Sequence, residues 1–132
     1  MKKTLLILAG LLGVLAVVLG AFGEHALKSQ LSAAQLSTYQ TGIQYHFYHL
    51  IGILACVSLS EGKHAGAWLH RAGLLFVLGI FCFSGSIYLL ACKDLLGLAE
   101  WTQIIGPITP IGGVFFVLGW GCVLIHGMRQ TF

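Results

Sequence analysis

Charged side chains are scarce in this sequence, and that scarcity narrows the class of protein. Only 8% of the 132 residues are charged and 58% are hydrophobic. A soluble domain carries about 25% charged residues, so a water-soluble globular protein is excluded. None of the four acidic residues lies inside a long hydrophobic run, which argues against a proton pump built on membrane carboxylates. The basic residues form no stripe with interleaved aromatics, so we expect no nucleic-acid partner.

Catalytic signatures are also missing. The sequence contains no G-x-S-x-G, no H-E-x-x-H and no phosphate-binding loop. Its four cysteines form no C-x-x-C pair and are interpreted as small apolar packing residues. His46 and His49 have no carboxylate or cysteine at matching depth, which disfavours a metal or haem site. We therefore predict no enzyme activity, no catalytic residue, no metal and no cofactor. A membrane enzyme, or a protein that handles quinone or haem, is the third interpretation.

What the chain has instead is four long uncharged runs. Each is about as long as the roughly 20 residues that a transmembrane helix needs. The predicted fold is an all-α integral membrane protein, a four-transmembrane-helix bundle in one domain of residues 1–132. The spans are expected at about residues 4–23, 41–60, 72–92 and 107–127. The first run follows Met1-Lys2-Lys3 as in a signal peptide, but it exceeds the usual signal core of about 7–15 residues, so we interpret it as a span.

The basic residues predict how the spans are oriented. Lys and Arg in short loops favour the cytoplasmic side. With alternating spans, two basic residues share one side, Lys28 and Lys93. Five share the other, namely Lys2, Lys3, Lys63, Arg71 and Arg129. We therefore expect an integral protein of the bacterial inner membrane, embedded in the lipid bilayer, with both termini in the cytoplasm.

Small residues mark the expected helix contacts. In the first span Ala9, Gly13, Ala16, Gly20 and Gly23 follow the spacing 4-3-4-3, which keeps one stripe facing a partner in a left-handed crossing. Small side chains there let two backbones approach closely. The stripe itself leaves open whether its partner belongs to the same chain. Three later glycines are also expected at close contacts, namely Gly85, Gly112 and Gly113.

Two helix starts are visible in the sequence. Ser32-x-x-Gln35 resembles a capping box, which predicts that the second helix begins at Ala33, before the membrane. Thr109 followed by Pro110 is typical of an N-cap and a first helical position. The fourth helix is therefore predicted to begin at Pro110.

Polar residues gather at one end of the spans. Along the second helix, Gln40 and Gln44 lie on one flank, and Tyr45 and His49 lie on the adjacent flank. His49 lies about 13 Å beyond Gln40 along the helix, within the hydrocarbon, where it needs a polar partner. We expect that partner to be Tyr88 or Ser84. The full predicted polar cluster is His25, Gln40, Gln44, Tyr45, His49, Ser84, Ser86, Tyr88 and Thr109.

This cluster has two interpretations. As an outward-facing pocket or proton path between the helices, it would indicate a small channel or transporter. As a network of interhelical hydrogen bonds, at about 0.6 kcal/mol per bond, it would hold the bundle together. The small size, the small-residue stripe and the missing catalytic set favour a non-enzymatic scaffold or accessory subunit, in a homo-oligomer or a larger membrane complex.

Four segments together resemble one family. They read GAFGEHALK at 20–28, YQTGIQYHFYH at 39–49, FSGSIYLLA at 83–91 and TPIGGVFFVLGW at 109–120. In order and spacing they are similar to the small four-span membrane proteins of the domain-of-unknown-function 423 (DUF423) family, over nearly the whole chain. The resemblance implies a four-span membrane fold and supplies no activity. It rests on Gly20, Gly23, His25, Gln40, Tyr45, His49, Ser84, Gly85, Ser86, Tyr88, Thr109, Pro110, Gly112, Gly113, Gly119 and Trp120.

Overall fold

The structure, a computed structural model, describes residues 2–60 and 66–129. Four long helical segments run through it. They are α1 (Lys2–His25), α2 (Ala33–Leu59), a third segment made of α3 (Ala67–Gly79), η2 (Ile80–Ser84) and α4 (Gly85–Ala91), and finally α7 (Ile108–Met128). No strand occurs in these described ranges. Each long segment is long and apolar enough to cross a membrane, so the predicted all-α fold with four membrane-spanning helices is confirmed.

Short helical turns make the connections at one end of the bundle. A 3-10 turn, η1 (Leu27–Ser29), leads from α1 to α2. Between α4 and α7 the chain forms α5 (Lys93–Leu96), η3 (Ala99–Trp101) and α6 (Thr102–Ile105). Gly97 ends α5 with a φ of 66°, a left-handed conformation that glycine adopts without strain.

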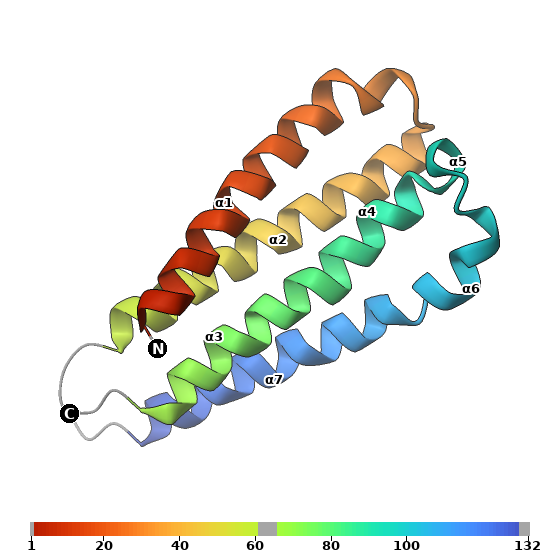
Figure 1. Cartoon of the computed structure of the whole chain (residues 1–132). Helices are drawn as coiled ribbons and strands as arrows, with labels where there is room; N and C mark the ends of the chain where they lie inside the picture. Colours follow the sequence, from red (N-terminus) through yellow and green to blue (C-terminus); the bar gives the residue numbers. More distant parts are fainter. Residues whose placement is uncertain (1, 61–65, 130–132) are drawn as a thin grey trace.

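The four segments lie side by side in sequence order (Figure 1). α1 packs on α2, α2 packs on the α3–η2–α4 segment, and that segment packs on α7. The start of α1 and the end of α7 lie at one end of the bundle, whereas α5 and α6 lie at the other. α1 and α7 are therefore the outer helices, and smaller shares of their residues are buried than in the two middle segments.

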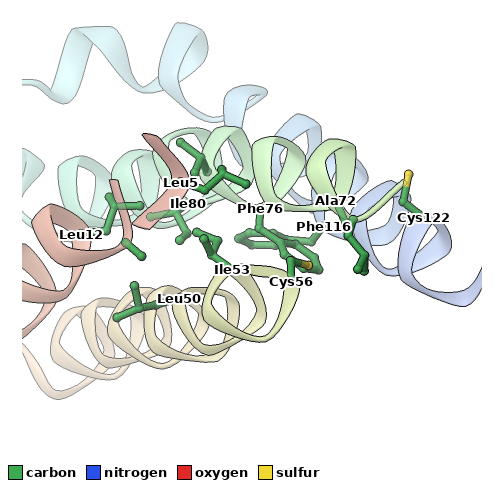
Figure 2. Packing of buried hydrophobic residues seen from close by; sticks show 13 residues of the cluster. Leu5, Leu12, Leu50, Ile53, Cys56, Ala72, Phe76, Ile80, Phe116 and Cys122 are labelled. Atoms are coloured by element: carbon green, nitrogen blue, oxygen red, sulfur yellow. The ribbon is translucent and has the colours of Figure 1, made fainter. Parts of the chain in front are cut away.

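Apolar side chains from all four segments point into one core (Figure 2). Ile53 of α2 and Phe76 of α3 are fully buried, Leu5 and Leu12 come from α1, and Phe116 comes from α7. Lipid tails are as apolar as these side chains, so close packing rather than removal from water holds membrane helices together. The fit of this core therefore decides the stability of the bundle.

Glycines make room for the two phenylalanine rings of the core. A Cβ atom at Gly119 of α7 would lie 2.6 Å from the ring of Phe76, and one at Gly79 of α3 would overlap the ring of Phe116. Each helix thus offers a glycine to a ring of the other. Since neither position has space for a side chain, α3 and α7 pack this closely only because both residues are glycines.

A single π-helical turn, η2, interrupts the third segment between α3 and α4. Such turns often mark functional positions in helices. Phe83 lies in this turn, and a Cβ atom at Gly112 of α7 would overlap its backbone nitrogen and lie 2.7 Å from its Cα. At Gly113 the nearest atom would be 3.9 Å away, at Cδ2 of the Phe83 ring. α7 therefore meets the π turn backbone against backbone at Gly112.

The capping box that the sequence predicts at the start of α2 is confirmed. The backbone N–H of Gln35 donates to the Ser32 hydroxyl at 3.2 Å, and the backbone N–H of Ser32 donates to the Gln35 side-chain oxygen at 2.9 Å. Both donors would otherwise have no partner at the helix start.

The predicted start of the fourth helix is wrong by two residues. α7 begins at Ile108, with Pro107 in the N-cap position. Thr109 and Pro110 therefore lie inside the first turn. A proline is tolerated there because the N–H groups of the first turn have no helical partner. The Thr109 hydroxyl does not cap the helix and bonds Ser86 instead.

Two cationic side chains lie over Trp68 at the end where α1 begins. The guanidinium carbons of Arg71 and Arg129 lie 5.0 and 5.3 Å from the centre of the Trp68 ring. The Arg129 contact connects the end of α7 to the start of α3, whereas the Arg71 contact lies within α3. Lys63, which the orientation argument also uses, lies outside the described residues.

A second, smaller core lies at the opposite end, where Tyr39 packs with Leu27, Ala91 and Cys92. The Tyr39 hydroxyl donates to the Leu19 carbonyl of α1 at 2.7 Å. Cys92 directly follows α4, and burial raises the pKa of its thiol because the charged thiolate is poorly solvated there. This core fastens α1 and α4 to α2 near the short connecting helices.

Candidate functional site

His49 connects α2 to α7 inside the bundle. Its Nδ1–H donates to the Tyr45 carbonyl at 2.8 Å, and its Nε2 accepts from the indole N–H of Trp120 at 3.3 Å. The two bonds together define a neutral ring with its hydrogen on Nδ1. The ring also stacks on Phe116, with centroids 3.4 Å apart and planes 6° from parallel. His49 is 5% exposed, so its polar atoms are satisfied within the protein.

His46 has the partner that the sequence predicts for His49. Its Nδ1 lies 3.1 Å from the Tyr88 hydroxyl of α4. The expected pairing of His49 with Tyr88 or Ser84 is therefore wrong, because a step of three residues turns His49 toward α7. His46 Nε2 and Ser84 Oγ are buried without a well-formed hydrogen bond in the described chain. Only weak contacts are left to them, of His46 with the Leu12 backbone and of Ser84 with Tyr88. Each such atom costs free energy, which offsets part of the stability that the His46–Tyr88 bond provides.

Two hydroxyls join α4 to α7 where the two helices meet at their ends. Ser86 Oγ and Thr109 Oγ1 are 2.6 Å apart. Ser86 Oγ also donates to the Phe83 carbonyl at 3.0 Å. A serine hydroxyl carries one hydrogen, so Thr109 donates to Ser86 while Ser86 donates to Phe83. This chain of bonds fixes α7 against the π turn.

The other predicted residues lie on the α1 side of α2 or at its end. The Gln40 amide donates to Glu24 of α1 at 3.2 Å, and Glu24 also pairs with Lys28 at 3.4 Å. Gln40 and Gln44 line a hollow of about 250 Å³ between α1 and α2. His25 is exposed at the last position of α1.

The predicted polar residues thus belong to different helix contacts. Gln40 and Gln44 lie at the contact of α1 with α2, and Tyr88 of α4 bonds α2. His49 of α2 bonds α7, and Thr109 of α7 bonds α4. The structure does not gather all nine of them into one pocket. A functional role for any of them stays a prediction.

An aromatic groove of about 860 Å³ runs between α2 and α7. Tyr45, Tyr48 and His49 line it from α2, Phe83 lines it from η2, and Trp120 lines it from α7. Tyr48 is 57% exposed and Trp120 is 50% exposed, so the groove opens on the outside of the bundle. Among the described residues that line it, none is charged.

The small-residue stripe of α1 lies against α2 of the same chain. A Cβ atom at Gly23 would lie 2.7 Å from the Tyr39 ring, whereas Gly13 and Gly20 leave ordinary contact distances of 3.5 and 3.9 Å. Ala16 is fully buried on the same face. The stripe therefore does not supply an interface to another molecule. Gly85, another predicted packing position, has its nearest such contact at 3.9 Å, with the backbone of its own helical segment.

Three residues that complete these contacts were not predicted as site residues. Trp120 and Phe116 hold His49, and His46 holds Tyr88. A signal for His46 was present, because the buried positions of α2 repeat with the spacing 3-4-3-4-3 and include both histidines. The positions with this spacing are Tyr39, Gly42, His46, His49, Ile53 and Cys56, and Leu50 and Gly52 are buried beside them.

In the described part of the chain, no group of three or more His, Cys, Asp or Glu side chains is arranged to hold a metal ion. The absence of a metal or cofactor stays a prediction from the sequence.

The family profile described as "Protein of unknown function (DUF423)" matches residues 19–113. The chain belongs to the DUF423 family. This confirms the resemblance that rests on the four sequence segments. The family match and the four apolar helices together identify a membrane protein. No solved structure matches the chain.

Relatives match almost end to end. The chain is 35% identical over 127 residues to the UPF0382 membrane protein YwdK of Bacillus subtilis, covering 96% of this chain and 98% of that protein. It is 40% identical over 123 residues to a UPF0382 membrane protein of Staphylococcus saprophyticus, covering 93% and 95%. It is 33% identical over 128 residues to the UPF0382 inner membrane protein YgdD of Escherichia coli, covering 97% and 92%.

Proposed function

We propose that this chain is a non-enzymatic scaffold or accessory subunit of the bacterial inner membrane, working in a homo-oligomer or a larger membrane complex. The observation that carries the proposal is how its membrane-embedded polar groups are used. His46 bonds Tyr88, Trp120 bonds His49, and Thr109 bonds Ser86, each pair joining two different helical segments. Such bonds hold helices in place, which is the task of a structural protein.

The outer helices offer the surface for a partner. Exposed aliphatic side chains cover the faces of α1 and α7 that point away from the bundle. Gly10 on α1 and Gly121 on α7 have open space where a Cβ atom would be, with nothing within 4 Å. Small residues on a lipid-facing helix surface let a second helix approach closely. These two glycines are the proposed contact points.

The test is the assembly state of the full chain in a mild detergent or in lipid nanodiscs, measured by native mass spectrometry. We expect the wild type to form a complex larger than one chain of 14.2 kDa. Gly10→Leu or Gly121→Leu should dissociate it and leave the melting temperature unchanged, because neither position touches the chain's own core. Ala55→Leu, at an exposed position of α2, is the matched control. A wild-type protein that stays monomeric and captures no partner would refute the proposal.

The alternative function is a small channel or transporter. The hollow of about 250 Å³ that Glu24, Gln40 and Gln44 line between α1 and α2 is the observation in its favour. Toward the other end of the bundle, however, Leu5, Ile53 and other apolar side chains fill the core. Ion or solute flux through proteoliposomes that falls with Gln40→Ala, at unchanged folding, would favour this alternative.

The orientation is part of the same proposal. Lys2, Lys3, Arg71 and Arg129 belong to the end of the bundle where α1 starts and α7 ends, and Lys28 belongs to the opposite end. This bias in basic residues supports a cytoplasmic location for both termini.

A further inference from the structure

We propose that the groove between α2 and α7 binds a neutral, lipid-soluble molecule whose ring carries a carbonyl oxygen, as a quinone does. Its volume of about 860 Å³ lies within the range of about 300–1,000 Å³ that is usual for small-molecule sites. The groove opens sideways between two membrane-spanning helices, so its ligand enters from the bilayer. The inference does not rest on the assembly proposed above, because one chain forms the whole groove.

Charge narrows the class of ligand. None of the described residues that line the groove is charged. A phosphate or ammonium group entering it would lose its hydration without gaining an ion pair, which is costly at this depth. Phospholipid headgroups and soluble ions are therefore poor ligands, and a neutral molecule is favoured.

The walls favour a flat ring over a flexible chain. Tyr45 lies 4.7 Å from Phe83 and 6.3 Å from Phe116, measured between ring centroids, so the rings form a continuous aromatic surface. The π turn places Phe83 in this surface, and the close contact at Gly112 holds α7 against it. Aromatic rings gain specific stacking energy with another ring in addition to apolar contact.

Two phenol groups supply the polar recognition. Tyr45 and Tyr48 line the groove, and neither hydroxyl has a hydrogen-bond partner within the described chain. The Trp120 N–H is already donated to His49, so these phenols are the donors that remain. A polar group without a partner in hydrocarbon costs free energy. A ring carbonyl can accept their hydrogens, whereas a saturated acyl chain cannot.

The test uses the fluorescence of Trp120 in lipid nanodiscs. Trp68→Phe and Trp101→Phe leave Trp120, which lines the groove, as the reporter. Decylubiquinone, a quinone with a short alkyl tail, is added to the bilayer in increasing mole fraction. We expect quenching that saturates. An N-acetyltryptophan octyl ester in the same nanodiscs gives the non-saturating quenching that random encounters produce.

Variants then separate the contributions. Tyr45→Phe and Tyr48→Phe keep the rings and remove the hydroxyls. For a tyrosine that donates to the quinone, the mole fraction of decylubiquinone at half-saturation should rise about two- to tenfold. Val117→Phe, at an exposed position of the groove wall, should abolish saturation by filling the groove. Leu124→Phe, seven residues further along α7 and outside the groove, is the matched control and should bind as the wild type does.

Three results would overturn the proposal. One is wild-type quenching that follows the free ester without saturation. Another is a mole fraction at half-saturation that neither tyrosine substitution changes, together with equal competition by decylbenzene. Decylbenzene has the ring and the tail without the carbonyl oxygens, so the groove would then bind any apolar molecule. The third is efficient crosslinking between copies of the Val117→Cys protein whose yield does not fall when decylubiquinone is added. That result would assign the groove to a second copy of the chain.

Discussion

The contact between Gly112 of α7 and the π turn should be the most sensitive point of the bundle to an added methyl group. In Gly112→Ala, the new Cβ atom would overlap the backbone nitrogen of Phe83 and lie 2.7 Å from its Cα. Real Cβ atoms essentially never approach closer than 3.0 Å. Because the obstructing atoms are backbone, no rotamer change relieves the overlap, and α7 has to move away from η2.

That movement has a calculable cost. Overpacking of a core costs about 1–3 kcal/mol, and more where backbone has to shift. The displacement also loosens the neighbouring contacts of α7, which include the Ser86–Thr109 hydrogen bond and the fit of Phe116 beside Gly79. We therefore expect the free energy of unfolding to fall by about 3 kcal/mol, which is about a hundredfold in the unfolding equilibrium.

The neighbouring residue provides the control for this substitution. In Gly113→Ala, the new Cβ atom would lie 3.9 Å from Cδ2 of the Phe83 ring, an ordinary contact. Unfolding by sodium dodecyl sulfate in mixed micelles, followed by circular dichroism, gives both free energies. Labelling of the buried thiols Cys56 and Cys122 by a maleimide dye reports the same transition independently. Equal stability of the Gly112→Ala and Gly113→Ala proteins would refute the packing argument.

Three further outcomes are expected. A double-mutant cycle of His49→Leu and Trp120→Phe, measured by the same unfolding, should give a coupling of about 0.6–1.7 kcal/mol; a coupling of zero would remove this bond as a link between α2 and α7. Ser84→Ala should leave the free energy of unfolding unchanged or raise it, because it deletes a buried hydroxyl without a well-formed hydrogen bond, whereas a clear loss would show that its weak contact with Tyr88 stabilises the bundle. A cysteine replacing Ser29, in a chain without other cysteines, should react with a membrane-impermeant maleimide in intact cells, and labelling only after lysis would reverse the proposed orientation.

The helices could be predicted from the sequence because their signals are local. Runs of apolar residues give the number of spans, and Ser32 with Gln35 gives the start of α2. The start of α7 could not be read this way. Two prolines stand three residues apart there, at Pro107 and Pro110, and both are compatible with a first turn. α7 begins directly after Pro107, and the Thr109 hydroxyl bonds Ser86. That contact is tertiary, so the local sequence does not reveal it.

The partners of the histidines were harder to predict for a geometric reason. His46 and His49 are one helical turn apart, and a small difference in rotation about the axis of α2 decides which one faces α4 and which one faces α7. Sequence spacing gives the flank of a helix and does not give the identity of the neighbour across it. Trp120, whose N–H reaches His49 at 3.3 Å, belongs to a helix with no polar pattern around it.

The positions of the polar residues on α2 separate the two kinds of role proposed here. The histidines lie on the buried 3-4 stripe, where neighbouring helices supply partners, and their bonds hold the bundle together. Tyr45 and Tyr48 lie just off that stripe, at its open edge beside α7, and their hydroxyls are left without protein partners. The bonds to Tyr88 and Trp120 give the histidines a structural role. The Tyr45 ring also packs on Phe83, but this packing leaves the two tyrosine hydroxyls unexplained. The position of the two tyrosines on the helix, rather than their polarity, is therefore the reason why we propose that they bind a ligand from the bilayer.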